Sequence, residues 1–321
     1  MKKYLITGGC GFIGSHAVRY LLKKHADSTV VNLDLLTYAG KEENVYDIDE
    51  KRHCFIRGDI GDAVLVRDLF AQYDFDCVIN FAAETHVDNS IVGPNVFIRT
   101  NVLGTHTLLN CALNAWQDQK GFAAKKFIQI STDEVYGSLG SSGSSRESDI
   151  LNPSNPYSAS KASADLLALS YYKTYGMPIV ITRCTNNYGP HQDVEKFIPL
   201  MITNAIQNKP LPVYGDGKNI RDWIYVDDHC AAVDLVAENG RCGEIYNIGT
   251  HNEWQNKTIA ATILKKLDKP ETLIELVTDR LGHDRRYSLD FSKIEQELHW
   301  VPQIDFETGL DQTILWYSSR I

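Results

Sequence analysis

The feature of the sequence that most constrains its fold is a short apolar run that leads directly into a cluster of glycines. Residues 4–14 read YLITGGCGFIG, and a helical pattern follows at 15–24. Gly8, Gly11 and Gly14 permit a tight turn, close approach of the backbone to a pyrophosphate, and close packing of helix on strand. The N-terminus of the helix offers unpaired N–H groups and a positive dipole end to the phosphates. This unit predicts a dinucleotide-binding α/β fold.

An acidic residue after the second apolar run indicates which dinucleotide is bound. Asp34 follows the run at 29–33 and lies about 20 residues beyond Gly14, where a carboxylate accepts hydrogen bonds from both ribose hydroxyls. The same carboxylate repels a 2′-phosphate, so NAD is favoured over NADP. Strand-end positions complete the expected cofactor-binding set, which is Gly8, Gly11, Phe12, Ile13, Gly14, Asp34, Asp59, Ile60, Ala82, Ala83, Tyr157 and Lys161.

Short apolar runs alternate with helical patterns through the first half of the chain. The runs are rich in Val, Ile and Phe, as strands buried on both faces are. Such alternation predicts a Rossmann-like, doubly wound parallel sheet. The expected strands are 4–7, 29–33, 77–81, 127–130 and 179–183, and the clearest helices are 15–24, 63–72, 100–116 and 157–175.

After about residue 185 the alternation decays and Gly/Pro punctuation increases. This change predicts a smaller α/β substrate-binding domain at the C-terminal end, which covers the carboxyl edge of the sheet, where ligands of such folds bind. The segment 137–148, GSLGSSGSSRES, predicts a mobile surface loop. We expect an NAD-binding domain of 1–184 that the chain re-enters at about 220–248, and a substrate domain of 185–219 and 249–321.

Composition excludes several classes of protein. The net charge of −9, from 32 basic and 41 acidic residues, argues against nucleic-acid binding. No apolar stretch approaches the roughly 20 residues of a membrane helix, and no leader precedes the first strand, so we expect a cytoplasmic protein. The seven cysteines are scattered without a CxxC motif, which favours reduced thiols and no metal site.

Tyr157 and Lys161 are spaced i, i+4 at the start of an expected helix, so their side chains share one face. A phenol is a poor base near its free pKa of about 10. A nearby ammonium, together with the positive charge of a nicotinamide, favours the phenolate. Tyr157 is then able to take a hydroxyl proton as hydride leaves the same carbon, which is general-base catalysis.

Two adjacent carboxylic acids follow the strand at 127–130, in the sequence STDEVYG. Thr132, Asp133 and Glu134 are expected to project from the carboxyl edge of the sheet towards a substrate. Adjacent carboxylates repel one another, so one of them is driven towards the protonated form. The pair therefore predicts an acid and a base in one site.

Several motifs resemble a known superfamily. TGGCGFIG, STDEVYG and YSASK are similar to the extended short-chain dehydrogenases/reductases. Further motifs along nearly the whole chain resemble the dTDP-glucose 4,6-dehydratase family within it. These are AAETHVDNSI (82–91), NNYGP (186–190), PLPVYGDG (210–217), RDWIYVDDH (221–229) and GHDRRY (282–287).

The resemblance implies an internal redox cycle on a sugar nucleotide. Tyr157, assisted by Thr132, would remove the glucose 4-hydroxyl proton while hydride passes from C4 to NAD. Glu134 would then remove the C5 proton as Asp133 protonates the departing C6 hydroxyl, and the hydride would return to C6. Because NAD is regenerated in each turnover, it should be held tightly.

The same resemblance implies the substrate contacts. His86 and Asn186 would contact sugar and phosphate, and Thr132 the sugar. Pyrophosphate contacts would come from Arg221 and Asn256, with His283 and Tyr287 near the diphosphate. Lys196, Pro212 and Tyr214 would form the nucleotide pocket, with Tyr214 stacked on a pyrimidine.

Three alternatives stay open at this stage. The substrate of the dehydratase could be UDP-glucose or UDP-N-acetylglucosamine, or the enzyme could be a C4 epimerase, against which the Asp133–Glu134 pair argues. A catalytically silent NAD sensor or scaffold should have lost Tyr157, Lys161 or Glu134, and all three are present. The family also implies a homodimer through a four-helix bundle formed by helices near 100–116 and 157–175.

Overall fold

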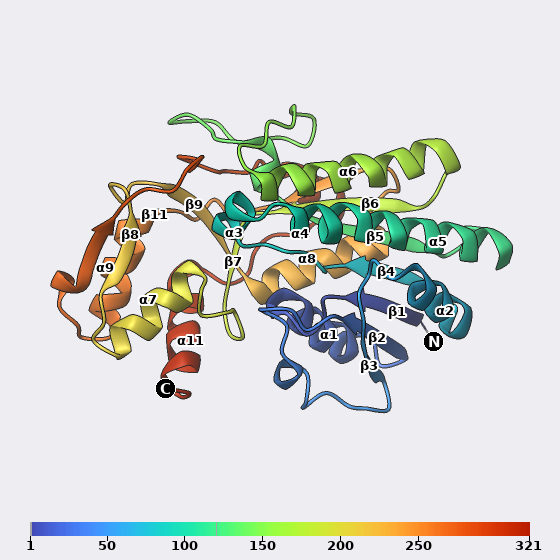
Figure 1. The fold of residues 1–321 in the computed structure, drawn as a ribbon, viewed down its shortest axis with the longest axis horizontal. Helices are drawn as coiled ribbons and strands as arrows, with labels where there is room; N and C mark the ends of the chain where they lie inside the picture. The colour runs from blue at the N-terminus through green and yellow to red at the C-terminus, as the bar shows by residue number, and fades with distance from the viewer. Residues whose placement is uncertain (1, 120) are drawn as a thin grey trace.

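The computed structural model describes residues 2–119 and 121–321 and contains one large parallel sheet (Figure 1). Its seven strands lie in the order β10-β6-β5-β4-β1-β2-β3, and every neighbouring pair is parallel. This arrangement confirms the expected doubly wound sheet. The strands are β1 (Lys2–Thr7), β2 (Ser28–Asp34), β3 (His53–Arg57), β4 (Cys77–Asn80), β5 (Lys126–Thr132), β6 (Ile179–Cys184) and β10 (Ile245–Ile248).

Helices cover both faces of this sheet and form two apolar cores. Successive residues of β1 serve opposite faces: Tyr4 and Ile6 pack in one core, and Leu5 in the other. Trp116 is fully buried in the second core, and its ring N–H donates to the carbonyl of Phe75 at 3.0 Å. The covering helices are α1 (Phe12–Lys24), α2 (Ala63–Tyr73), α5 (Thr105–Gln119), α6 (Pro156–Tyr175), α8 (Val226–Asn239) and α10 (Ser292–Leu298).

The helix expected at 100–116 is part of a longer helical segment with wider turns at its start. α3 (Val87–Val92) and α4 (Asn95–Phe97) precede a π-helical stretch, η2 (Ile98–Gly104), that continues into α5. Wide turns of this kind re-aim side chains and are frequent at functional sites. Here the Asn101 amide bonds both backbone groups of Glu84 and the Ser160 hydroxyl at 2.8–3.0 Å, which ties η2 to α6 and to the carboxyl end of β4.

A second region with its own apolar core follows the sheet. That core includes Ile198, Met201, Ile263 and Leu264, all fully buried. α10 lies outside this region. It packs on α8 and on β10 of the large sheet. The elements are β7 (Asn186–Tyr188), β8 (Leu211–Tyr214), β9 (Ile220–Tyr225), β11 (Glu253–Gln255), β12 (Ile274–Val277), α7 (Phe197–Ile206), α9 (Asn256–Lys266) and α11 (Phe306–Ser318).

The Gly/Ser-rich segment 137–148 is a largely exposed loop, as its composition predicts, and it is hydrogen-bonded to residues 286–288. Leu139 and Ser145 donate backbone hydrogen bonds to Arg286 and Ser288, both at 2.9 Å. The Arg286 guanidinium donates back to the carbonyl of Gly143 at 2.8 Å. Composition alone misses this result because the partners are distant in sequence. Among the described helices, none is long and apolar enough to span a membrane.

Candidate active site

A cavity of about 310 Å³ opens where the strands of the large sheet end at their carboxyl edge. Most of the residues predicted from the sequence meet there, although they come from segments far apart in the chain. Those in the cavity wall are Gly8, Gly11, Phe12, Ile13, Gly14, Asp34, Asp59, Ile60, Ala82, Ala83, Thr132, Asp133, Glu134, Tyr157, Lys161, Asn186 and Lys196.

The glycine-rich turn has the geometry that a bound dinucleotide requires. Gly8 has φ +70°, and a Cβ on it would lie 2.8 Å from the backbone of Ala82. A Cβ on Gly14 would lie 2.1 Å from the Gly8 carbonyl oxygen. No side chain caps α1 at Gly11, so the N–H groups of the first turn have no partner in the helix. They face the cavity and fit a pyrophosphate.

Asp34 is held in place by the backbone around it. One carboxylate oxygen accepts from the Cys10 N–H and the other from the Leu36 N–H, both at 2.8 Å. Burial raises the pKa of Asp34, and these two hydrogen bonds oppose that effect. The Gly11 N–H also bonds this carboxylate, and the acceptor capacity that remains is available to a ribose hydroxyl.

Asp133, which is buried, and Glu134, which is partly buried, form a pair of acids at the end of β5, in the short helix η3 (Asp133–Tyr136). One Asp133 oxygen accepts from the Thr132 hydroxyl at 3.1 Å, and the other is buried without a partner among the described residues. Burial, and then the charge of Glu134, raises the pKa of Asp133 well above its usual range. Burial also raises the pKa of Glu134, but Arg221 and Arg280 counteract the rise.

Tyr157 and Lys161 lie in the first turns of α6, which begins with a capping box of Asn155 and Ser158. Both side chains are buried, and the Lys161 ammonium donates to the carbonyl of Ile130 at 2.6 Å. Burial, followed by the charge of Glu134, raises the pKa of Tyr157 well above its usual range. Burial is the largest cause of this rise, and the charges of the nearby acids add to it. The phenolate expected from the sequence depends in addition on the positive charge of a nicotinamide.

The remaining predicted substrate residues lie outside the cavity wall, mostly in the second region. Arg221 stacks over the Tyr287 ring at 4.4 Å and donates to the Asp284 carbonyl at 2.9 Å. The charges of Arg221 and Tyr287 both interact with that of Glu134, which places them beside the acid pair. Asn256 begins α9, and its side-chain oxygen is buried without a partner among the described residues.

The remaining predicted substrate residues are Tyr214, His283, Pro212 and His86. The Tyr214 ring meets the His283 ring at 5.9 Å, and its hydroxyl donates to Asp88 at 3.1 Å. Pro212 precedes Tyr214 on β8 by two positions, so both side chains share one face of the strand. His86 caps α3 and lies 3.7 Å from Glu195.

Sequence reasoning missed Arg280. Its guanidinium lies over the Tyr214 ring at 5.3 Å and pairs with Asp88 at 3.6 Å. Its Nε is buried without a hydrogen-bond partner among the described residues, and its charge acts on Glu134 and Lys196. The available signal was the run of arginines around GHDRRY, but a run does not indicate which arginine faces the site.

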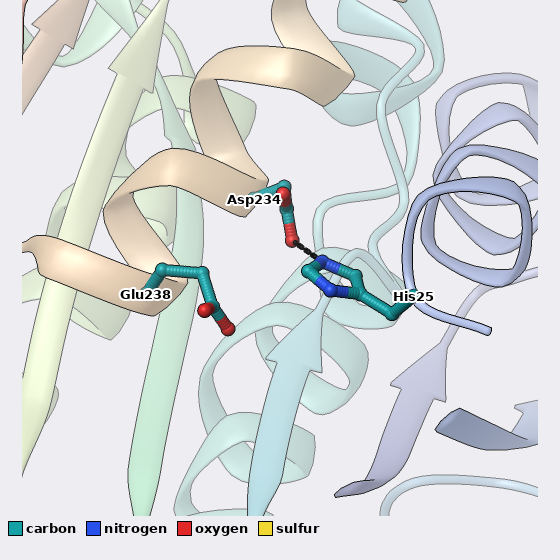
Figure 2. Close-up of side chains that lie close together, drawn as sticks. All are labelled: His25, Asp234 and Glu238. Carbon is teal, nitrogen blue, oxygen red and sulfur yellow. Dashed lines mark hydrogen bonds and ion pairs between the residues drawn. The ribbon is translucent and has the colours of Figure 1, made fainter. Parts of the chain in front are cut away.

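A second cluster of ionisable side chains, drawn in Figure 2, lies at the amino ends of the strands, where His25 follows α1 and Glu238 pairs with Lys2 at the start of β1. His25, Asp234 and Glu238 have ligand atoms within 4.8 Å of one another, which could geometrically hold a metal ion. However, Asp234 pairs with His25 and Lys24, both at 2.8 Å, and Glu238 pairs with Lys2 at 2.6 Å. We interpret the cluster as an ion-pair network between α1, α8 and β1.

Known proteins resemble this chain over nearly its whole length. The family model described as GDP-mannose 4,6 dehydratase matches residues 5–313. The dTDP-glucose 4,6-dehydratase of Shigella flexneri is 47% identical, covering 98% of this chain and 92% of the relative. The low-salt glycan biosynthesis protein Agl12 of Haloferax volcanii is 50% identical, covering 98% of this chain and 97% of that protein.

Solved structures separate the fold from the family. DesIV of Streptomyces venezuelae, a dTDP-glucose 4,6-dehydratase with NAD and TYD bound, has a TM-score of 0.93 and 48% identity, covering 99% of this chain and 97% of that one. The UDP-glucose 4-epimerase of Thermotoga maritima has a TM-score of 0.89 but 28% identity, covering 99% of both chains. The fold is thus common to dehydratases and epimerases, whereas sequence identity is much higher with the dehydratases. This chain belongs to the dTDP-glucose 4,6-dehydratase family, within the NAD-dependent epimerase/dehydratase superfamily.

Proposed function

We propose that this chain is an NAD-dependent 4,6-dehydratase that converts dTDP-glucose to dTDP-4-keto-6-deoxyglucose. The observation that carries the proposal is the adjacent Asp133–Glu134 pair beside Tyr157 in one cavity wall, where Asp133 and Tyr157 are buried and Glu134 is partly buried. An epimerase needs one base for oxidation at C4, whereas a dehydratase also needs an acid and a base for elimination. The names of the relatives, at about half identity over nearly full length, support the same reaction.

The cofactor in this proposal is NAD, which is bound in the related Streptomyces structure. The uncapped N-terminus of α1 would receive its pyrophosphate, and Asp34 a ribose. When bound, NAD accepts hydride from C4, returns it to C6 and brings the positive charge of its nicotinamide ring into the cavity. Gly8 lies so close to the backbone of Ala82 that a side chain on Gly8 would collide with it.

Oxidation at C4 is assigned to Tyr157 and Thr132. Tyr157 takes the proton of the 4-hydroxyl, and Thr132 hydrogen-bonds the same centre. Because burial and the neighbouring acids raise the pKa of Tyr157, positive charge is needed to favour the phenolate. Lys161 contributes an ammonium to the same wall. Burial lowers the pKa of Lys161, and the charge of Asp165 raises it.

Elimination is assigned to the acid pair. Asp133 is the acid, because its strongly raised pKa keeps it protonated, and it protonates the departing C6 hydroxyl. Glu134 is the base that removes the C5 proton, because Arg221 and Arg280 favour its carboxylate. The positive potential from these arginines also suits a substrate diphosphate, to which an Arg fork binds in a bidentate manner.

We assign recognition of the diphosphate, the nucleobase and the sugar to separate groups of residues. The proposed diphosphate contacts are Arg221, Arg280, Asn256, His283 and Tyr287, all in the second region. Lys196, Pro212 and Tyr214 would hold the nucleobase, and His86 and Asn186 the sugar and phosphate. Arg280 is the residue that the structure adds to the set taken from the sequence.

We also propose a homodimer through η2, α5 and α6. These elements lie side by side on one face of the large sheet (Figure 1). The aliphatic side chains of Ile98 and Leu103 on η2 and of Leu166 on α6 are exposed by 45–59%. A second copy would bury them. Sedimentation that shows only monomer at micromolar concentration would contradict this arrangement.

The function is tested by incubating the purified protein with dTDP-glucose, UDP-glucose and GDP-mannose in parallel and recording mass spectra. Loss of one water from dTDP-glucose, without added reductant, is the expected result. Faster loss of water from another nucleotide would keep the reaction and change the substrate. Unchanged mass combined with inversion at C4, detected by NMR, would instead indicate an epimerase.

A further inference from the structure

A charged pair that has no part in the mechanism above lies fully buried behind the candidate catalytic centre. Arg183 on β6 and Asp165 on α6 are at most 2% exposed, and the Arg183 Nε donates to an Asp165 oxygen at 2.9 Å. The Ser131 hydroxyl donates to that same oxygen at 3.0 Å, and the second oxygen is buried without a partner among the described residues. A buried ion pair contributes little net stability, because desolvation offsets the attraction.

The place of Asp165 relates it to Lys161. The two residues are one turn apart on α6, so their side chains share a face, and helical side chains lean towards the N-terminus. The Asp165 carboxylate lies one turn C-terminal of Lys161 on that face, and its charge acts on the buried ammonium. Consecutive residues of β5 bind the two groups: Ile130 accepts from the Lys161 ammonium at 2.6 Å, and Ser131 donates to Asp165.

Arg183 holds this carboxylate in place from the neighbouring strand. It lies opposite Ser131 in the β5–β6 register. Its guanidinium also lies over the Tyr136 ring at 4.8 Å and donates to the Tyr136 hydroxyl at 2.9 Å. That hydroxyl donates in turn to the Asn247 side chain at 2.8 Å, so the guanidinium is anchored on its far side.

We propose that Asp165, held by Arg183, is a positioning residue that keeps the Lys161 ammonium charged and directed at the cavity wall. The inference rests on the proposed function, because Lys161 acts within it. It extends that function by giving a role to a residue that touches neither substrate nor cofactor.

The charges around Lys161 determine the direction of the effect. On α6 it faces Tyr157 and Asp165, on β6 Cys184, and on η3 Asp133 shares its cavity wall. Burial lowers the pKa of Lys161, and the charge of Asp165, then that of Cys184, raises it. Removal of the Asp165 charge therefore lowers the pKa of Lys161. The ammonium is then lost at a lower pH than in the wild type.

The test compares Asp165→Asn with the wild type as holoenzymes, measuring kcat for dehydration between about pH 6 and pH 10. The amide keeps the size of the side chain and one acceptor oxygen. The alkaline limb of the profile is expected to move to lower pH, with about a tenfold loss of rate on that limb for each pKa unit. The affinity for NADH, measured by fluorescence, should weaken over the same pH range.

A double variant and a matched control separate positioning from folding. Asp165→Asn with Arg183→Gln leaves no unpaired buried charge, so it remains informative if the single variant does not fold. Asp234→Asn also removes a buried carboxylate from an ion pair, but at the amino ends of the strands, and should leave the pH profile unchanged. A wild-type alkaline limb in the double variant overturns the inference. A wild type inactive on every nucleotide tested overturns the proposed function instead.

Discussion

Replacing Glu134 by glutamine should separate the two halves of the proposed reaction. The amide keeps the size of the side chain but does not accept a proton from C5. Loss of a general base costs about 10²- to 10⁴-fold in rate, or about 3–5 kcal/mol in barrier height. The proposed assignment places this loss in the elimination step. The proton acceptor for C4 oxidation is Tyr157, on a different element, α6.

The substitution also changes its neighbour. The Glu134 charge is the second cause of the raised pKa of Asp133, after burial. In the Glu134→Gln variant the pKa of Asp133 therefore falls. Burial, the largest cause of the raised pKa, continues to favour the protonated form of Asp133.

The assay is a rapid mix of the NAD-loaded variant with dTDP-glucose, followed by absorbance and by mass spectrometry. Hydride transfer from C4 should continue, so NADH absorbance should appear and persist while the dehydrated product is lost. Glu147→Gln is a control outside the cavity wall, since Glu147 accepts from the Asn247 backbone N–H at 2.9 Å. Wild-type turnover in Glu134→Gln would refute the assignment. A variant that forms neither NADH nor product would place Glu134 in the oxidation step.

Three further substitutions test other parts of the molecule. Gly14→Ala should yield purified protein that contains little NAD, because the added Cβ would lie 2.1 Å from the Gly8 oxygen and displace the glycine turn by about 1 Å. The NAD content of the purified protein is the measurement, and retention of NAD would contradict the geometry. Arg280→Gln should raise KM for the nucleotide sugar at least as much as it lowers kcat, and an unchanged KM would remove Arg280 from the binding set. Ile263→Ala, fully buried in the second core, should lower the free energy of unfolding by about 2–5 kcal/mol in a denaturant titration. A change below 0.5 kcal/mol, the range of surface substitutions, would contradict that burial.

Much of the fold and of the cavity wall was predictable from local pattern. The alternation of apolar runs and helices predicted the parallel sheet, and Asp34 and the glycines predicted one wall of the cavity. These predictions succeed because strand and helix periodicity, turn chemistry and strand-end positions depend on residues close in sequence. The 137–148 segment shows the limit, since its partners at 286 and 288 lie far along the chain.

The sequence by itself determined the doubly wound sheet, the glycine turn, the acidic pair Asp133–Glu134 and the spacing of Tyr157 and Lys161. Tertiary structure alone decided which charges surround those groups: that Arg280 faces Glu134, and that a buried Asp165–Arg183 pair lies behind Lys161. The physical reason is that pattern follows from local geometry, whereas electrostatic effects depend on distance and burial in space. A carboxylate becomes an acid or a base only through neighbours that the folded chain brings to it.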